Sequence, residues 1–239
     1  MELVRRVSTF VAVLAATLTP ASALAYEATT VADGGSISGK VLYDGDVPMR
    51  KIIPTKDKSV CGEIREEPEI VVGDDKAVLD AIVYLKDVKK GKAWQKPAKP
   101  PEIVNKDCVF VPHVQALPVG SLVIVNSDPV MHNTHGFLGK ATVFNVALPM
   151  KDQRIERKLT KPGLMRVECD AHGWMLAWVY AAENPYYAVT AKDGAFQITD
   201  VPPGSYTLVA WHELTGETEV PVTVKPKEAV DVKVQLQKK

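Results

Sequence analysis

The stretch VECDAHGWMLAW, residues 167–178, places a cysteine, a histidine and a methionine at intervals of three residues. They are Cys169, His172 and Met175, in a chain with only three cysteines and five histidines. A thiol, an imidazole and a thioether this close together either bind a metal ion or simply occupy the end of a strand. Other segments of the sequence are needed to decide between these two interpretations.

A second segment, NSDPVMHNTHGF at residues 126–137, supplies two more imidazoles, those of His132 and His135, on a loop that leaves a predicted strand. Two imidazoles, a thiolate and a weak thioether are the ligands of blue-copper electron-transfer sites. Sulfur ligands favour Cu(I), and imidazole accepts both oxidation states. Each residue alone would more often be a packed or surface residue than a ligand, but their joint occurrence favours a metal site.

The composition is that of an ordinary globular protein, with 46% hydrophobic and 24% charged residues. The 29 basic and 29 acidic residues balance, so bulk charge gives no reason to expect binding to nucleic acid or to an anionic membrane. Seventeen prolines and fifteen glycines favour a protein rich in strands and turns.

The N-terminus has the layout of a secretory signal peptide. Arg5 and Arg6 precede an apolar run at residues 7–18, and small residues follow up to Ala25. The apolar run is shorter than the roughly 20 residues that a membrane-spanning helix needs. We therefore expect cleavage of residues 1–25 and a periplasmic or secreted mature chain without a membrane span.

Short alternating apolar runs, separated by Gly, Pro, Asn and Asp, follow one another from residue 103 onward and predict an all-β sandwich or Greek-key barrel. Two earlier runs, at residues 36–45 and 77–87, predict further strands. The basic, proline-rich segment 89–102 predicts a connecting loop. Near the C-terminus, the Asp193-Gly194 pair lies between two alternating runs and predicts a hairpin.

The segments NSDPVMHNTHGF and CDAHGWM together resemble the cupredoxin family, and its amicyanin-like members most closely. Those members carry Met-Pro-His-Asn-x-His-Phe and later Cys-x-x-His-x-x-Met, with the same short steps. The resemblance implies a cupredoxin Greek-key domain at residues 101–185. It also implies one type 1 copper site with the four ligands His132, Cys169, His172 and Met175.

The same resemblance assigns roles to neighbouring residues. Asn133 would steady the ligand loop, and His135 would not be a ligand. Met131 departs from the family pattern, which has proline at that position. With Cys169 assigned to the metal, Cys61 and Cys108 are expected to form a disulfide in an oxidising compartment, although two separate buried thiols are the alternative.

The segment AVTAKDGAFQITDVPPGSYTLVAWHE, residues 188–213, resembles the carboxypeptidase regulatory-like family, which has an Ig-like or transthyretin-like β-sandwich. That fold begins with strands resembling those predicted near residues 36–45 and 77–87. We therefore expect a discontinuous sandwich built from residues 36–90 with 186–239, into which the copper domain is inserted.

The sequence thus predicts an extracytoplasmic type 1 copper protein that carries single electrons between protein redox partners. An exposed apolar edge near His172, formed by Trp174, Met175 and Ala177, is expected to contact these partners. Two alternatives stay open. The C-terminal sandwich could be a module that binds a carbohydrate or a protein, or the copper could be stored or delivered without electron transfer.

An enzyme is not expected. The chain has no His-x-x-Glu set of the kind that zinc hydrolases use. Five histidines are too few for the second copper centre of a multicopper oxidase or a copper nitrite reductase. His113 is expected to be a surface or core residue, and no metal role is predicted for His212.

Overall fold

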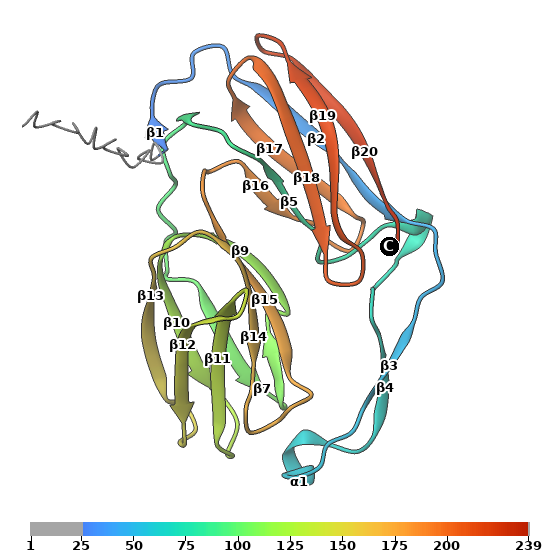
Figure 1. Ribbon diagram of the computed structural model, residues 1–239, viewed down its shortest axis with the longest axis vertical. Helices are drawn as coiled ribbons and strands as arrows, with labels where there is room; N and C mark the ends of the chain where they lie inside the picture. Colours follow the sequence, from blue (N-terminus) through green and yellow to red (C-terminus); the bar gives the residue numbers. More distant parts are fainter. Residues whose placement is uncertain (1–25, 239) are drawn as a thin grey trace, which may run out of the picture.

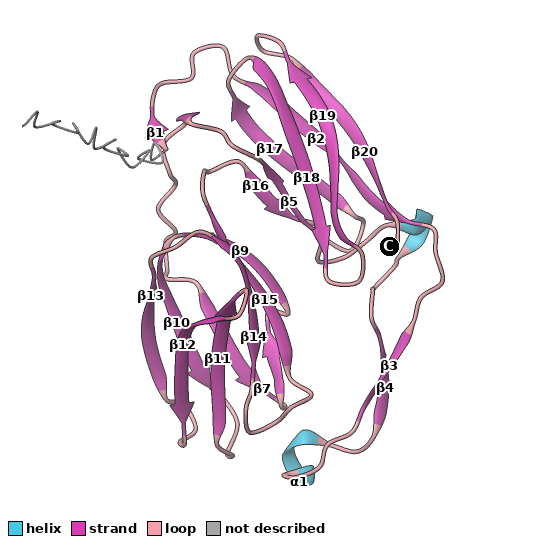
Figure 2. Cartoon of the chain, in the orientation of Figure 1, coloured by secondary structure: helices cyan, strands magenta, loops and turns pink. Residues whose placement is uncertain are grey.

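The computed structural model describes residues 26–238, so the predicted signal peptide lies outside the described residues. The chain forms two β-sandwiches, one above the other in Figure 1, with a long arm beside them. Helix is limited to short segments within the described range (Figure 2), and none of them is long and apolar enough to cross a membrane. The expectation of an all-β fold is confirmed.

The lower sandwich in Figure 1 contains residues 102–182 and consists of two sheets. Its four-stranded sheet has the order β13 (Arg154–Leu159), β10 (Gly120–Asn126), β7 (Glu102–Lys106) and β8 (Val109–Val111). Its five-stranded sheet has the order β12 (Ala141–Leu148), β11 (His132–Leu138), β14 (Gly163–Glu168), β15 (Leu176–Ala182) and β9 (Val114–Pro118).

Alternation along the strands creates the core between these two sheets. In β12, Phe144, Val146 and Leu148 are buried, whereas the residues between them are exposed. Successive side chains of a strand point to opposite faces, so each strand contributes one apolar face. The core cluster also contains Cys169 and Met175, which places the predicted metal-binding stretch at the edge of this core.

The upper sandwich also has two sheets. One has the order β16 (Tyr187–Val189), β5 (Ile82–Leu85), β18 (Gly204–His212) and β19 (Gly216–Val224). The other has the order β17 (Ala195–Val201), β2 (Gly35–Tyr43) and β20 (Ala229–Leu236). A short parallel pair, β1 (Glu27–Ala28) with β6 (Lys90–Gly91), lies beside them.

The early strands β2 and β5 lie within the sheets of the C-terminal strands. β5 pairs with both β16 and β18, and β2 pairs with β17 and β20. The chain between β5 and β16 therefore contains the whole lower sandwich, while the strands on either side of it build the upper one.

The predicted hairpin at Asp193-Gly194 is wrong. Gly194 does form a tight turn, with φ of 68° and its amide donating to the carbonyl of Ala191 at 2.9 Å. However, β16 and β17 on either side belong to different sheets. The turn carries the chain from one sheet to the other, because β16 pairs with β5 and β17 pairs with β2 instead of with each other.

A two-stranded arm, residues 49–68, leaves the upper sandwich and reaches the far end of the lower one (Figure 1). Its strands are β3 (Met49–Ile52) and β4 (Arg65–Pro68), and its tip is the helix α1 (Lys58–Cys61). The expected disulfide between Cys61 and Cys108 is confirmed. It joins the end of α1 to the turn between β7 and β8, and so fastens the arm to the lower sandwich.

The two sandwiches meet at a partly buried polar contact. The carboxylate of Glu213 accepts hydrogen bonds from His113 Nε2 at 2.5 Å and from Trp178 Nε1 at 2.9 Å. Burial alone would lower the pKa of His113 and raise the pKa of Glu213. Their hydrogen bond and opposite charges have the reverse effect and dominate, so the pKa of His113 is raised and the pKa of Glu213 is lowered. Trp178 also packs edge-on against Trp211, with ring centroids 4.9 Å apart. His113 is therefore an interface residue.

We predict that His212, beside this interface, makes the fold sensitive to acid. Burial lowers the pKa of His212 to about 4, whereas an unfolded histidine titrates near 6.5. As the pH falls below about 6.5, the unfolded chain binds a proton that the folded chain does not, so stability is lost until about pH 4. The His212→Asn variant should retain a hydrogen-bond acceptor for the Leu214 amide. Between pH 7 and pH 5, its free energy of unfolding should fall by about 2 kcal/mol less than that of wild type.

Urea unfolding at the two pH values measures this difference. Equal losses in the variant and in wild type would show that His212 does not titrate in this way.

Candidate metal centre

The predicted ligands meet at the end of the lower sandwich where β11 begins and β14 ends. His132 is the first residue of β11, and Cys169 follows the last residue of β14. These two strands pair antiparallel, which brings the start of one beside the end of the other. Two tight turns follow: the amide of His172 donates to the carbonyl of Cys169 at 3.1 Å, and that of Met175 to the carbonyl of His172 at 2.9 Å.

Three ligand atoms converge in this loop cluster. Cys169 Sγ lies 3.6 Å from His172 Nδ1 and 4.0 Å from His132 Nδ1, and the two Nδ1 atoms are 3.1 Å apart. Metal–nitrogen and metal–sulfur bonds are about 2.0–2.3 Å long, so ligands of one shared ion lie roughly 3–4 Å apart. The spacing of the three atoms therefore fits a single ion between them.

Both imidazoles are held by carboxylates on their opposite side. His132 Nε2 lies 2.8 Å from Asp128 Oδ2, and His172 Nε2 lies 3.0 Å from Asp57 Oδ2. An ionised carboxylate only accepts hydrogen bonds, so each Nε2 carries the hydrogen and each Nδ1 presents its lone pair to the site. Burial also lowers the pKa of His132, which favours the neutral ring that binds a metal.

Asn133 connects the two loops that carry the predicted ligands. Its backbone amide donates to Cys169 Sγ at 3.4 Å. Its side-chain oxygen accepts from the amide of Asp170 at 3.1 Å. A donor to the sulfur and a clamp across the loops both restrict movement of the cysteine.

Met175 is the fourth predicted ligand. Its side chain is buried, with 3% exposure, in the hydrophobic cluster that also contains Cys169. The turn at His172 brings its backbone back toward the other ligands.

The remaining histidines lie elsewhere. His135 Nδ1 contacts Asp170 at 3.0 Å and its Nε2 contacts Thr142 Oγ1 at 2.9 Å, so both ring nitrogens are engaged outside the site. His113 lies at the interface between the sandwiches, and His212 is buried in the upper one. The structure thus brings His132, and not His135, together with Cys169.

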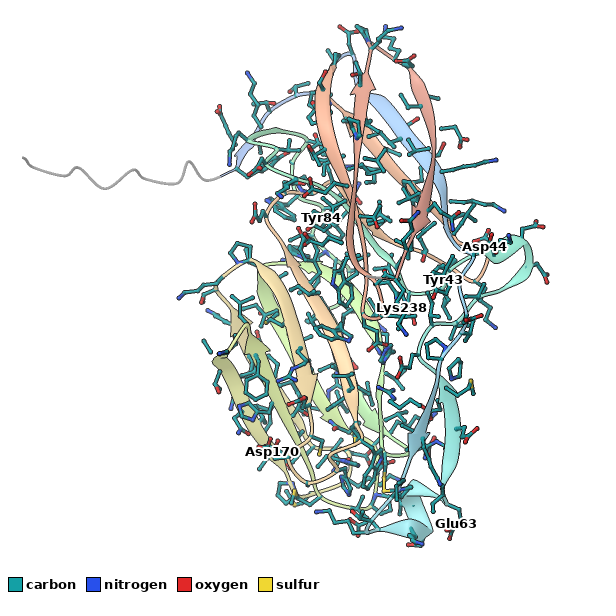
Figure 3. All side chains as sticks on the ribbon, turned by 45° about the vertical axis from the view of Figure 1, so that its right-hand side comes forward. Tyr43, Asp44, Glu63, Tyr84, Asp170 and Lys238 are labelled. Carbon is teal, nitrogen blue, oxygen red and sulfur yellow. A yellow bond between two sulfur atoms is a disulfide. The ribbon has the colours of Figure 1, made fainter. Side chains whose placement is uncertain are left out.

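The expected exposed edge near His172 is wrong. The exposed fractions of His172, Met175 and Ala177 are 0%, 3% and 0%, because the arm and the loop residues cover this end of the sandwich. Trp174 is half-buried, with its ring centroid 5.1 Å from that of His172. In Figure 3, Glu63 on the arm and Asp170 on the ligand loop lie at the same end of the molecule.

Sequence reasoning missed the two carboxylates. Asp128 lies within the NSDP segment before His132, and a polar residue directly after a strand is a usable signal. Asp57 lies 115 residues from His172, and nothing around it in the sequence indicates the contact.

Comparison with known proteins supports the description of the upper sandwich. Residues 177–237 match the family model of the carboxypeptidase regulatory-like domain. A search of curated proteins found no match.

Solved structures of copper proteins are similar to part of this chain, between 34% and 42% of it. A purple cupredoxin from Nitrosopumilus maritimus is 22% identical over 34% of this chain and 99% of that chain, with a TM-score of 0.31. A reduced Cu(I) proline-to-glycine variant of amicyanin is 19% identical over 37% and 87%, with a TM-score of 0.31. A copper-containing nitrite reductase from Thermus scotoductus SA-01 is 21% identical over 38% of this chain and 24% of that chain, with a TM-score of 0.32.

The chain is therefore an all-β protein of two sandwiches with a buried cluster of metal-ligand type. Part of it, residues 177–237, is similar to the carboxypeptidase regulatory-like domain.

We predict that Asp128 supports this site even without metal. Its side chain accepts hydrogen bonds from His132 and from the amides of Asp107 and Cys108, at 2.7–3.0 Å. The Asp128→Ala substitution leaves these donors, of which the His132 ring and the Cys108 amide are buried, without a partner and should cost about 2–4 kcal/mol of unfolding free energy.

The matched control is Asp170→Ala, because Asp170 also contacts a histidine but its side chain is 53% exposed. It should cost less than about 1 kcal/mol. Denaturant unfolding of the metal-free variants compares the two, and equal costs would contradict the role given to Asp128.

Proposed function

We propose that this protein is a type 1 copper protein that carries single electrons between redox partners. One observation carries the proposal: the buried Cys169 Sγ and the Nδ1 atoms of His132 and His172 face one another within 4.0 Å. Two imidazoles, a thiolate and a thioether, the last supplied here by Met175, are the donor set of a blue-copper site. Copper bound there would supply one-electron chemistry by alternating between Cu(II) and Cu(I).

The chain's own residues support this role by keeping the ligands still. Electron transfer is favoured when neither oxidation state requires the ligands to move far. Asp128 and Asp57 fix the orientations of the two rings, and Asn133 fixes the sulfur. Burial of both imidazoles and of Cys169 would keep bulk water away from a bound ion.

A carrier with one copper ion, and not an enzyme, agrees best with where the other histidines lie. His113, His135 and His212 each have their own contacts away from the cluster, His113 and His212 near the contact between the sandwiches and His135 beside Asp170. We place the protein outside the cytoplasm, either in the periplasm or secreted. The disulfide Cys61–Cys108 and the predicted signal peptide support that location. We propose that its redox partners are proteins.

Copper storage or delivery is the second candidate. The observation that favours it is the complete burial of His172, since a closed site retains an ion but hinders direct contact with a partner. The two functions differ in what happens on reduction. A carrier keeps its copper through repeated cycles, whereas a delivery protein releases it.

We predict that the metal-free mature protein binds one equivalent of Cu(II) and develops an intense visible absorption band. Because the band depends on the copper–thiolate bond, Cys169→Ser should abolish it. His172→Asn should strongly weaken it, while the control His135→Asn should leave it unchanged. Titration with Cu(II), followed by absorbance and metal analysis, measures these outcomes.

Other results would support other functions. Colourless copper binding, or loss of copper when ascorbate is added, would favour storage or delivery. Absence of copper binding would leave a binding module as the function of the chain.

A further inference from the structure

The arm ends directly on the site. Its tip helix α1 carries Cys61, which is 4% exposed and packs in the core cluster of the lower sandwich, with Val60 partly buried against the same cluster. Asp57, the residue before α1, has a left-handed backbone with φ of 52°. Its carbonyl accepts from the amides of Val60 and Cys61, both at 2.9 Å, which fixes the turn that presents its side chain.

The disulfide that fastens the arm lies next to the ligands. The sulfur atoms of Cys61 and Cys108 and a ring nitrogen of His172 all lie within 4.8 Å of one another. On the other side, Asp128 Oδ2 accepts from both the Cys108 amide at 3.0 Å and His132 Nε2 at 2.8 Å. The attachment point of the arm and the two imidazoles therefore form one continuous set of contacts.

The arm comes from the other sandwich. Its strands β3 and β4 pair only with each other, and a two-stranded ribbon is marginally stable in isolation. It is held at its tip by the disulfide, by the contacts of α1 and by the Asp57–His172 hydrogen bond. While these contacts are in place, the His172 ring has no exposed surface.

We infer that the arm, residues 49–68, is a cover over the copper centre, and that Asp57 is the positioning residue of His172. Accepting the Nε2 hydrogen keeps Nδ1 available to the ion, and the arm separates the ring from solvent. Partners then exchange electrons across the arm or after its displacement. The positioning of His172 toward copper rests on the proposed function. The covering of the site by the arm does not, because it involves only residues of the chain.

Thiol reactivity in the metal-free protein tests the cover. With the disulfide intact, Cys169 is the free thiol among the described residues, and it is 1% exposed. Its rate of reaction with 5,5′-dithiobis(2-nitrobenzoate) reports how often the site opens. We expect the rate to rise at least about tenfold in Asp57→Ala and in the double variant Cys61→Ser with Cys108→Ser.

Glu63→Ala is the matched control. It removes a carboxylate from the same arm, but Glu63 is 77% exposed and pairs only with Lys58. Its rate should stay within about twofold of wild type. Unchanged rates in both Asp57→Ala and the double variant, with folding verified by circular dichroism, would overturn the proposal.

Copper affinity tests the positioning role separately. Loss of a partner of a ligating histidine typically weakens metal affinity by about 10–100-fold. Asp57→Ala should show this loss, while Asp57→Asn, whose amide oxygen still accepts from Nε2, should restore most of it. Unaltered affinity in Asp57→Ala would overturn the positioning role. If wild type binds no copper, the proposed function fails, yet the thiol rates still decide whether the arm covers the site.

Discussion

The pairing of β11 with β14 is the constraint on which the site depends. It joins two strands of the five-stranded sheet so that the first residue of one, His132, lies beside the residue that follows the other, Cys169. The rest of the ligand set needs only two tight turns after Cys169. The sandwich core below then buries the sulfur, and the carboxylates behind the rings fix their tautomers.

The second sandwich contributes to the site through the arm. The chain begins the upper sandwich, then forms the arm, which reaches the end of the lower sandwich where His132, Cys169 and His172 lie, and only afterwards forms the lower sandwich itself. The disulfide and Asp57 then connect parts of the chain that are far apart in sequence. A third connection, through His113, Glu213 and Trp178, joins the two sandwiches at their other contact. The lower sandwich is thus attached to the upper one both through the arm and through this direct contact.

Much of the fold and of the cluster could be predicted because the signals are local. Cys169, His172 and Met175 lie in one short loop of two turns, and the polar segment before His132 marks the loop that faces them. The two predictions that were wrong, the hairpin and the exposed edge, depend on contacts between distant parts of the chain. The Asp193-Gly194 turn has the composition of a hairpin, but the pairing partners of its flanking strands lie about 100 residues or more earlier in the chain, in β5 and β2. The exposed edge at His172 was expected from residues 101–185 alone, whereas the segment that covers it precedes them by many residues.

The most direct test of the central claim is a crystal structure of the copper-loaded protein with anomalous diffraction measured at the copper absorption edge. We expect one strong anomalous peak among Cys169 Sγ, His132 Nδ1 and His172 Nδ1, on the side of the rings opposite Asp128 and Asp57. A peak at another place, or copper bound without Cys169, would contradict the account.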